Sequence, residues 1–214
     1  MIRNRLRELT VEELANTITH GFGLVLSVIG FAGLLLLALR HGGVTLIASC
    51  AIYGLSLVVL YTASTCYHGA ICPVRKQKLR IVDRCCIYLL IAGSYTPFGF
   101  VISNETIGQG LLILIWLFAV VGILMTVFFP GRFPIVSVLS YVVMGWLGIF
   151  AVQPLFQALG IMPVVLAISG GIAYSLGVLF FAWDKVPHNH AIFHVFVLAG
   201  SVIHYFAVVI YVLR

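Results

Sequence analysis

Two histidines four residues apart, His190 and His194, are the first residues whose spacing suggests chemistry. A separation of four residues turns an α-helix by about 400°, so both imidazoles project from one face, about 6 Å apart along the axis. Two histidines at this spacing can bind one tetrahedral Zn²⁺, although no glutamate lies between them here. A third ligand must come from another helix, and His68 is expected at the matching depth. Imidazoles suit zinc, copper, iron or nickel. The alternative is a set of interfacial histidines that hydrogen-bond to lipid headgroups or loop carbonyls.

Asp83 and Ser64 are the candidate catalytic residues beside such a metal. Asp83 could orient or deprotonate a water bound to the metal, or it could simply cap the start of a helix. Ser64 lies one helical turn before His68 and could hydrogen-bond the same water. Its hydroxyl could equally bond back to a carbonyl of its own helix.

Other polar residues receive plainer interpretations. The run Glu12, Glu13, Asn16, Thr19 and His20 is interpreted as a surface helix with ordinary capping ahead of the first apolar segment. His41 falls in a solvated turn. His204 comes ten residues after His194, about 15 Å deeper and rotated off the metal face, so we expect it to be buried and hydrogen-bonded, with a proton-relay role as the alternative.

The composition shows what must position these groups. Of the 214 residues, 62% are hydrophobic and only 8% are charged, against about 25% charged in an average soluble domain. So few charges cannot cover a soluble surface, which excludes a soluble enzyme, a nucleic-acid binder and a disordered chain. The sequence therefore predicts an all-α membrane protein.

Seven segments are long and apolar enough to cross a bilayer as helices. They cover about residues 20–40, 44–68, 82–102, 109–129, 134–152, 163–183 and 190–213. Turns are expected at 41–43, 104–106, 130–134 and 154–163. The chain is thus predicted to be one seven-helix domain over residues 1–214, with residues 1–16 as a cytoplasmic N-terminal segment.

The basic residues predict the orientation of this bundle. With the N-terminus inside, ten of the twelve lysines and arginines fall on the cytoplasmic side, and only Arg40 and Arg214 fall outside. The C-terminus is then extracytoplasmic. In this arrangement five histidines (His20, His68, His188, His190 and His194) and Asp83 all lie at the cytoplasmic ends of their helices, where ionisable groups are usually functional.

Together these motifs resemble the haemolysin-III branch of the progestin and adipoQ receptor family, the bacterial relatives of the adiponectin receptors, over nearly the whole chain. The elements that carry the resemblance are Glu13-x-x-Asn16-x-x-Thr19-His20, Ser64-x-x-x-His68, Asp83, His190-x-x-x-His194 and His204. The resemblance implies a Zn²⁺ cofactor held by His68, His190 and His194, with a water near Asp83. The related alkaline ceramidases place a serine, here Ser64, beside that water. A cytoplasmic N-terminus and a place in the bacterial inner membrane are implied as well.

Activity is left open by the resemblance, since receptor members are described as ceramide hydrolases and the bacterial branch is linked to membrane homeostasis. The first hypothesis is a zinc-dependent hydrolase of lipid amide or ester bonds. The second is a non-enzymatic sensor or homeostasis protein with structural zinc, and the third is a haemolysin-like cytolytic protein. The scarcity of intramembrane charges at other depths argues against a polar pore. Membrane lipids, one of them a candidate substrate, are the expected partners, and no nucleic acid is expected.

Overall fold

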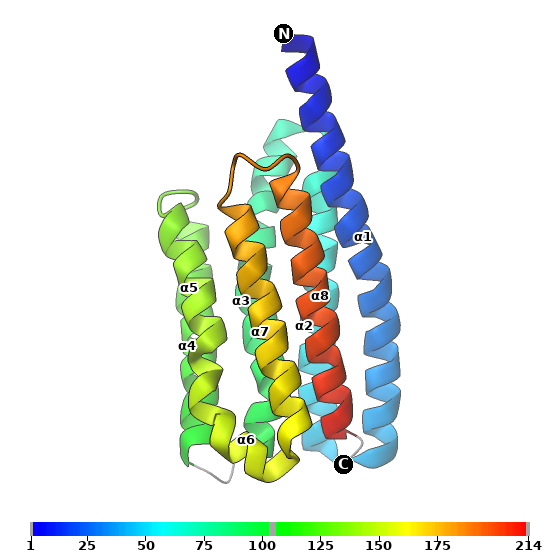
Figure 1. Cartoon of the computed structure of the whole chain (residues 1–214), viewed down its shortest axis with the longest axis vertical. Coiled ribbons are helices and arrows are strands. Elements are labelled where there is room, and N and C mark those ends of the chain that lie inside the picture. The colour runs from blue at the N-terminus through cyan, green and yellow to red at the C-terminus, as the bar shows by residue number, and fades with distance from the viewer. Residues whose placement is uncertain (1, 103–105, 213–214) are drawn as a thin grey trace.

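The computed structural model describes residues 2–102 and 106–212, with side chains described from residue 11 onward, and their regular structure is helical (Figure 1). The elements are α1 (Ile2–His41), α2 (Val44–Gly69), α3 (Pro73–Val101), α4 (Thr106–Phe128), α5 (Pro134–Trp146), the 3₁₀ helix η1 (Leu147–Ala151), α6 (Val152–Leu159), α7 (Ile161–Phe181) and α8 (Asn189–Val212). The predicted turn at 104–106 falls mainly on residues 103–105, which lie outside the described residues.

Seven helical segments are long and apolar enough to cross a membrane, and α5, η1 and α6 together form the fifth. In a bilayer, each backbone N–H and C=O must be satisfied within its own segment, so these apolar stretches become helices despite many β-branched residues. The predicted all-α fold with seven spans is confirmed. The chain is a multi-pass integral membrane protein.

Two helices begin well before the residues predicted for them. The first helix begins at Ile2, so His20 lies well inside it and the run before the span is part of the same helix. The third begins at Pro73, with proline in the first turn, so Asp83 is ten residues inside the helix and the helix-cap interpretation of Asp83 is wrong.

The stretch 154–163, predicted as a connection, is largely helical. Pro154 and Pro163 each lie in the first turn of their helix, α6 and α7, where proline costs no intrahelical hydrogen bond. The two helices are separated at Gly160, whose φ of 75° lies in the left-handed region that glycine adopts without strain.

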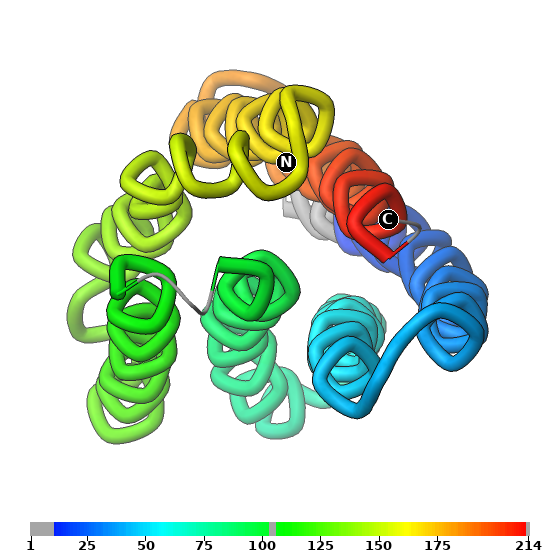
Figure 2. Tube along the Cα trace, turned by 90° about the horizontal axis from the view of Figure 1, so that it is seen from below, coloured from blue at the N-terminus to red at the C-terminus, as the bar shows by residue number. Residues whose placement is uncertain are grey.

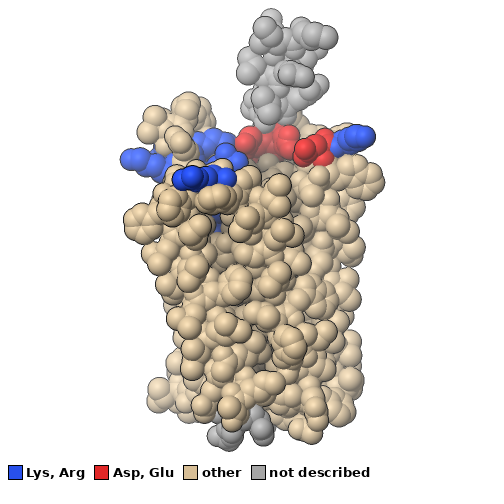
Figure 3. Space-filling model, turned by 90° about the vertical axis from the view of Figure 1, so that its left-hand side faces the viewer, with Lys and Arg blue, Asp and Glu red and all other residues tan. Residues whose placement is uncertain are grey.

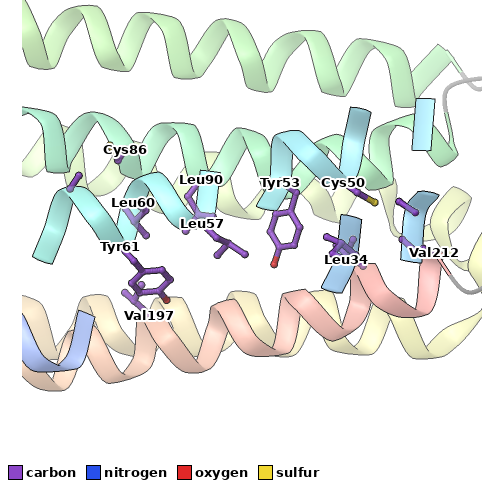
Figure 4. Close-up of a cluster of buried hydrophobic side chains, with 13 residues drawn as sticks. Leu34, Cys50, Tyr53, Leu57, Leu60, Tyr61, Cys86, Leu90, Val197 and Val212 are labelled. Atoms are coloured by element: carbon purple, nitrogen blue, oxygen red, sulfur yellow. The ribbon is translucent and has the colours of Figure 1, made fainter. Parts of the chain in front are cut away.

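Viewed end-on, the spans form a ring in which α1 packs against both α2 and α8, and this contact between the first and last helices closes the ring (Figure 2). The largest buried cluster lies among α1, α2, α3 and α8 (Figure 4). Tyr53 and Tyr61 project from α2 toward α8 within this cluster and are almost fully buried. The first, second and last helices are therefore held together along much of their length.

Charged side chains gather at the end of the bundle where the N-terminus lies, on the face shown in Figure 3. We call this the charged end. It comprises the described basic and acidic residues of that part of α1 and α3 and of the turns there: Glu12, Glu13, Arg75, Lys76, Lys78, Arg80, Asp83, Arg84, Arg132, Asp184 and Lys185. Because the same end contains the C-terminus of α2 and the N-terminus of α8, it also contains most of the histidines.

Candidate metal centre

His68, His190 and His194 converge at the charged end. One ring nitrogen from each lies within 4.8 Å of the others, close enough to hold a metal ion. The ring centroids of His190 and His194 are 4.6 Å apart, and His68 lies 5.0 Å and 4.9 Å from them. His68 and His194 are buried and His190 is partly buried. The structure thus brings together all three residues that the spacing argument had selected.

A hydrogen-bond network deeper in the bundle sets the relative positions of α2, α7 and α8. Tyr61 donates a hydrogen bond to the Ser201 hydroxyl at 2.9 Å, and the Tyr174 hydroxyl lies 2.9 Å from the same oxygen. Tyr61 precedes His68 by seven residues and Ser201 follows His194 by seven, which is about two helical turns in each case. The network therefore fixes the register that brings His68 to His194.

Glu13 orients His68. Its carboxylate lies 2.7 Å from His68 Nδ1 and 3.0 Å from Lys76 Nζ. Because a carboxylate accepts, Nδ1–H donates, and the free lone pair is on Nε2. His68 Nε2 is buried and has no hydrogen-bond partner among the described residues. Such a carboxylate–histidine pair is the usual support of a metal-binding imidazole, since it fixes the tautomer and the ring orientation.

His194 is oriented in a similar way by α1. Its Nδ1 lies 3.3 Å from the Thr19 hydroxyl oxygen. The Thr19 hydroxyl already donates to carbonyls of its own helix, so it accepts from His194 and leaves Nε2 of that ring as the unprotonated nitrogen. The His20 ring stacks on His194 with centroids 3.5 Å apart and an interplanar angle of 14°.

The interpretation of the Glu12–His20 run as a surface helix is wrong for most of its length. Asn16 and His20 are buried, and Glu13 and Thr19 contact the histidines. A signal for this was present in the sequence, because positions 13, 16 and 20 have the i, i+3, i+7 spacing of one helix face. That face is polar where it meets α2 and α8, which marks a buried site rather than a solvated surface.

Ser64 links His20 to Asp83. Its hydroxyl oxygen is 2.6 Å from His20 Nδ1, and Asp83 interacts with the same hydroxyl through a side-chain hydrogen bond. An ionised carboxylate only accepts, so in that state Ser64 donates to Asp83 and accepts from His20. On the same helix, Thr62 and Thr65 instead donate to carbonyls four residues earlier. The back-bonding interpretation of Ser64 therefore does not describe this structure.

The remaining histidines are apart from the centre. His41 is exposed as predicted, but it is the last residue of α1 rather than part of the following turn, and its Nδ1 lies 2.9 Å from the Leu37 carbonyl oxygen. His204 donates from Nε2 to the Ala167 carbonyl at 2.9 Å and contacts the Tyr174 ring. It also lines an apolar cavity of about 190 Å³ formed by α3, α4, the segment α5–η1–α6, α7 and α8, which the sequence had not predicted.

Comparison with known proteins identifies relatives of this chain. Residues 9–205 match the family described as "Haemolysin-III related". The chain is 43% identical to Hemolysin-3 of Bacillus cereus, over 98% of its own length and 95% of the relative. It is 42% identical to a Hemolysin-3 homolog of Bacillus subtilis, over 95% of each chain, and 31% identical to the Homo sapiens monocyte to macrophage differentiation factor, over 98% of this chain and 88% of the relative.

Proposed function

This chain belongs to the haemolysin-III-related family, and on that premise we propose that it is a zinc-dependent hydrolase of a lipid amide or ester bond. Its bacterial relatives and seven apolar helices support a place in the bacterial inner (plasma) membrane. The observation that carries the proposal is the convergence of His68, His190 and His194, with a buried and unpartnered Nε2 on His68.

The donor set fits zinc. Three imidazoles suit this ion, and a catalytic zinc site characteristically has three protein ligands and an open fourth position. His68, His190 and His194 would hold the ion, with Glu13 and Thr19 orienting two of the rings. When bound, zinc would supply Lewis-acid polarisation of a carbonyl group and acidify a water molecule.

Asp83 would act as the general base. Hydrolysis joins the oxygen of water to the carbonyl carbon and breaks the carbon–nitrogen or carbon–oxygen bond, and a proton of that water must reach the departing amine or alcohol. One Asp83 oxygen would accept that proton and later return it. Ser64 would keep the carboxylate in position, because its single proton is committed to Asp83. This assigns Ser64 a positioning role in place of the hydrogen bond to a metal-bound water that was considered from the sequence.

A lipid substrate is favoured by the location of the site. The three histidines lie on helices that are apolar enough to span a membrane, at the charged end where these helices leave the apolar region. Amide and ester bonds of lipids lie at the same depth, between headgroup and acyl chains.

The test compares Asp83→Asn with Asp184→Asn, which changes an exposed carboxylate in the turn before α8. The probes are a ceramide (amide) and a diacylglycerol (ester) in detergent micelles. Asp83→Asn should keep its zinc, since this carboxylate is not a ligand, and lose about 100-fold or more in hydrolysis. Ser64→Ala should keep zinc and lose about 10- to 100-fold, as supporting residues do. Asp184→Asn should match the wild type.

Two outcomes would overturn this function. Wild-type turnover by Asp83→Asn would remove the proposed base even if zinc is present. A zinc-loaded protein that hydrolyses neither probe, and in which Asp83→Asn only lowers thermal stability, would favour the sensor with structural zinc.

A further inference from the structure

A second polar site lies at the charged end, on a different set of helices from the histidines. A cleft of about 200 Å³ is formed by α3, α4, α5 and the turn between α4 and α5. This volume is far more than one water molecule requires. Its apolar lining includes Phe129 and Phe133, and its polar lining comes from Arg84, Tyr88, Thr126, Ser137 and Ser140.

The polar side of the cleft is built from fixed groups. The Tyr88 hydroxyl lies 2.7 Å from the Ser140 hydroxyl and joins α3 to α5. The Tyr141 hydroxyl donates to the Arg84 carbonyl at 3.2 Å and joins the same two helices one residue further along α5. The backbone at Arg84 is therefore held against α5, which forms the opposite wall of the cleft.

A second guanidinium, that of Arg132, lies beside two aromatic rings of the cleft without being one of its lining residues. Arg132 lies 5.4 Å from the ring centroid of Phe133 and 6.0 Å from that of Phe129, and both rings line the cleft. Contact with aromatic rings holds an arginine without neutralising its charge. Two positive charges thus flank one cleft.

Neither guanidinium has a carboxylate partner among the described residues, where the two ion pairs found are both made by Glu13, to His68 and Lys76. Asp83 is next to Arg84 in the sequence, but its hydrogen bond goes to Ser64 on α2. The Asp83 carboxylate still attracts Arg84 electrostatically, but neither arginine of the cleft is held in an ion pair among the described residues, so both are available to an anionic group from outside the chain.

The apolar wall of the cleft indicates which kind of anionic molecule fits there. Val121, Met125 and Val136 line the cleft and are 59%, 42% and 60% exposed, on helices that span the membrane. The cleft therefore opens to the lipid-facing surface. An occupant that matches both parts has an anionic group at the arginines and an acyl chain along the apolar wall.

We propose that this cleft binds an anionic phospholipid, whose phosphate pairs with Arg84 and Arg132 and whose acyl chain lies against α4. Guanidinium binds phosphate through paired, charge-assisted hydrogen bonds. Basic pockets between helices at a membrane surface are suited to such headgroups. The site shares no residue with the histidine cluster, so it does not depend on zinc or on hydrolysis.

Native mass spectrometry of the purified full-length protein can test this with phosphatidylglycerol and phosphatidylcholine in matched detergent. The wild type should retain one phosphatidylglycerol at an affinity at least tenfold above that for phosphatidylcholine. Arg84→Ala and Arg132→Ala should each weaken phosphatidylglycerol binding about tenfold, as loss of a charge-assisted contact implies. Arg75→Ala, which removes an exposed charge from the first turn of α3, should leave it unchanged.

Further variants separate a specific site from general attraction. Arg84→Lys keeps the charge but not the paired geometry, so it should also weaken binding while preserving the fold. Equal retention of the two lipids, or equal losses for Arg75→Ala and Arg84→Ala, would overturn the site. Complete displacement of the lipid by millimolar glycerol phosphate would assign the cleft to a soluble phosphate and overturn the phospholipid.

Discussion

His194 and His204 lie on the same helix, ten residues apart, and their surroundings differ completely. His194 has two other imidazoles within metal-binding distance and a threonine that fixes its tautomer. His204 donates to a backbone carbonyl of α7 and packs against Gly170, whose missing Cβ leaves room for the ring. One histidine belongs to a site and the other anchors two helices.

This difference shows that convergence, rather than residue type, makes a metal centre. Two helices, α2 and α8, and the polar face of α1 meet around His194, so ring nitrogens are oriented and Nε2 of His68 is left without a partner. Around His204, the carbonyl of Ala167 takes the ring N–H. An intramembrane histidine is costly in either place. His204 also keeps one ring nitrogen without a partner, but among the described residues only the first arrangement brings three imidazoles close enough to share a metal ion.

The predicted membrane topology sets the different depths of the two regions, and its test has the largest expected effect because each terminus lies either inside or outside the cell. A reporter fused to the N-terminus should be cytoplasmic and one fused to the C-terminus should be extracytoplasmic, since the basic residues favour that orientation. Protease or thiol-reagent access in intact cells would measure it. Both termini on one side would contradict an odd number of spans and the shared depth of the three histidines.

Glu13 provides a test of the support around the metal site. Glu13→Gln should lower zinc affinity about 10- to 100-fold, as loss of a carboxylate behind a ligating histidine does. The neighbouring Glu12→Gln is the matched control and should leave affinity unchanged. Competition with a chelating dye measures both variants. Equal affinities would mean that the 2.7 Å contact between Glu13 and His68 plays no part in metal binding.

Substitution of Gly170 provides a test of the region around His204. A Cβ at Gly170 would collide with the His204 ring, whereas at Gly171 the nearest atoms are 3.9 Å away in Trp146. Gly170→Ala should therefore destabilise the protein by about 1–3 kcal/mol, as overpacking does, and Gly171→Ala should be nearly neutral. Thermal unfolding in detergent distinguishes them, and zinc content should be the same in both. Equal stability of the two variants would remove the packing role assigned to His204.

Much of this architecture could be predicted because the bilayer restricts the choices. Long apolar segments must be helices, so the seven spans followed from hydropathy, and the i, i+4 pair His190 and His194 followed from helix geometry. Helix ends were less predictable. Pro154 was placed in a predicted connection, yet proline is also suited to a first turn, and α6 includes it there.

The contacts between helices could not be derived from one sequence. Glu13 meets His68 across 55 positions, and nothing local to either residue specifies that pairing. Ser64 posed the same problem, since its choice between its own helix and His20 depends on how α1 packs on α2. The arginine cleft requires α3 and α5 to be neighbours, which the chain order alone does not establish.

Zinc content of the purified protein is the most direct measurement of the central claim, and it needs no substrate. Elemental analysis should find about one zinc per chain in the wild type, and His68→Ala, His190→Ala and His194→Ala should each largely lose it, because three ligands are near the minimum for tight binding. His41→Ala and His204→Ala should keep full occupancy. A folded His190→Ala protein that still holds one zinc per chain would contradict the proposed centre.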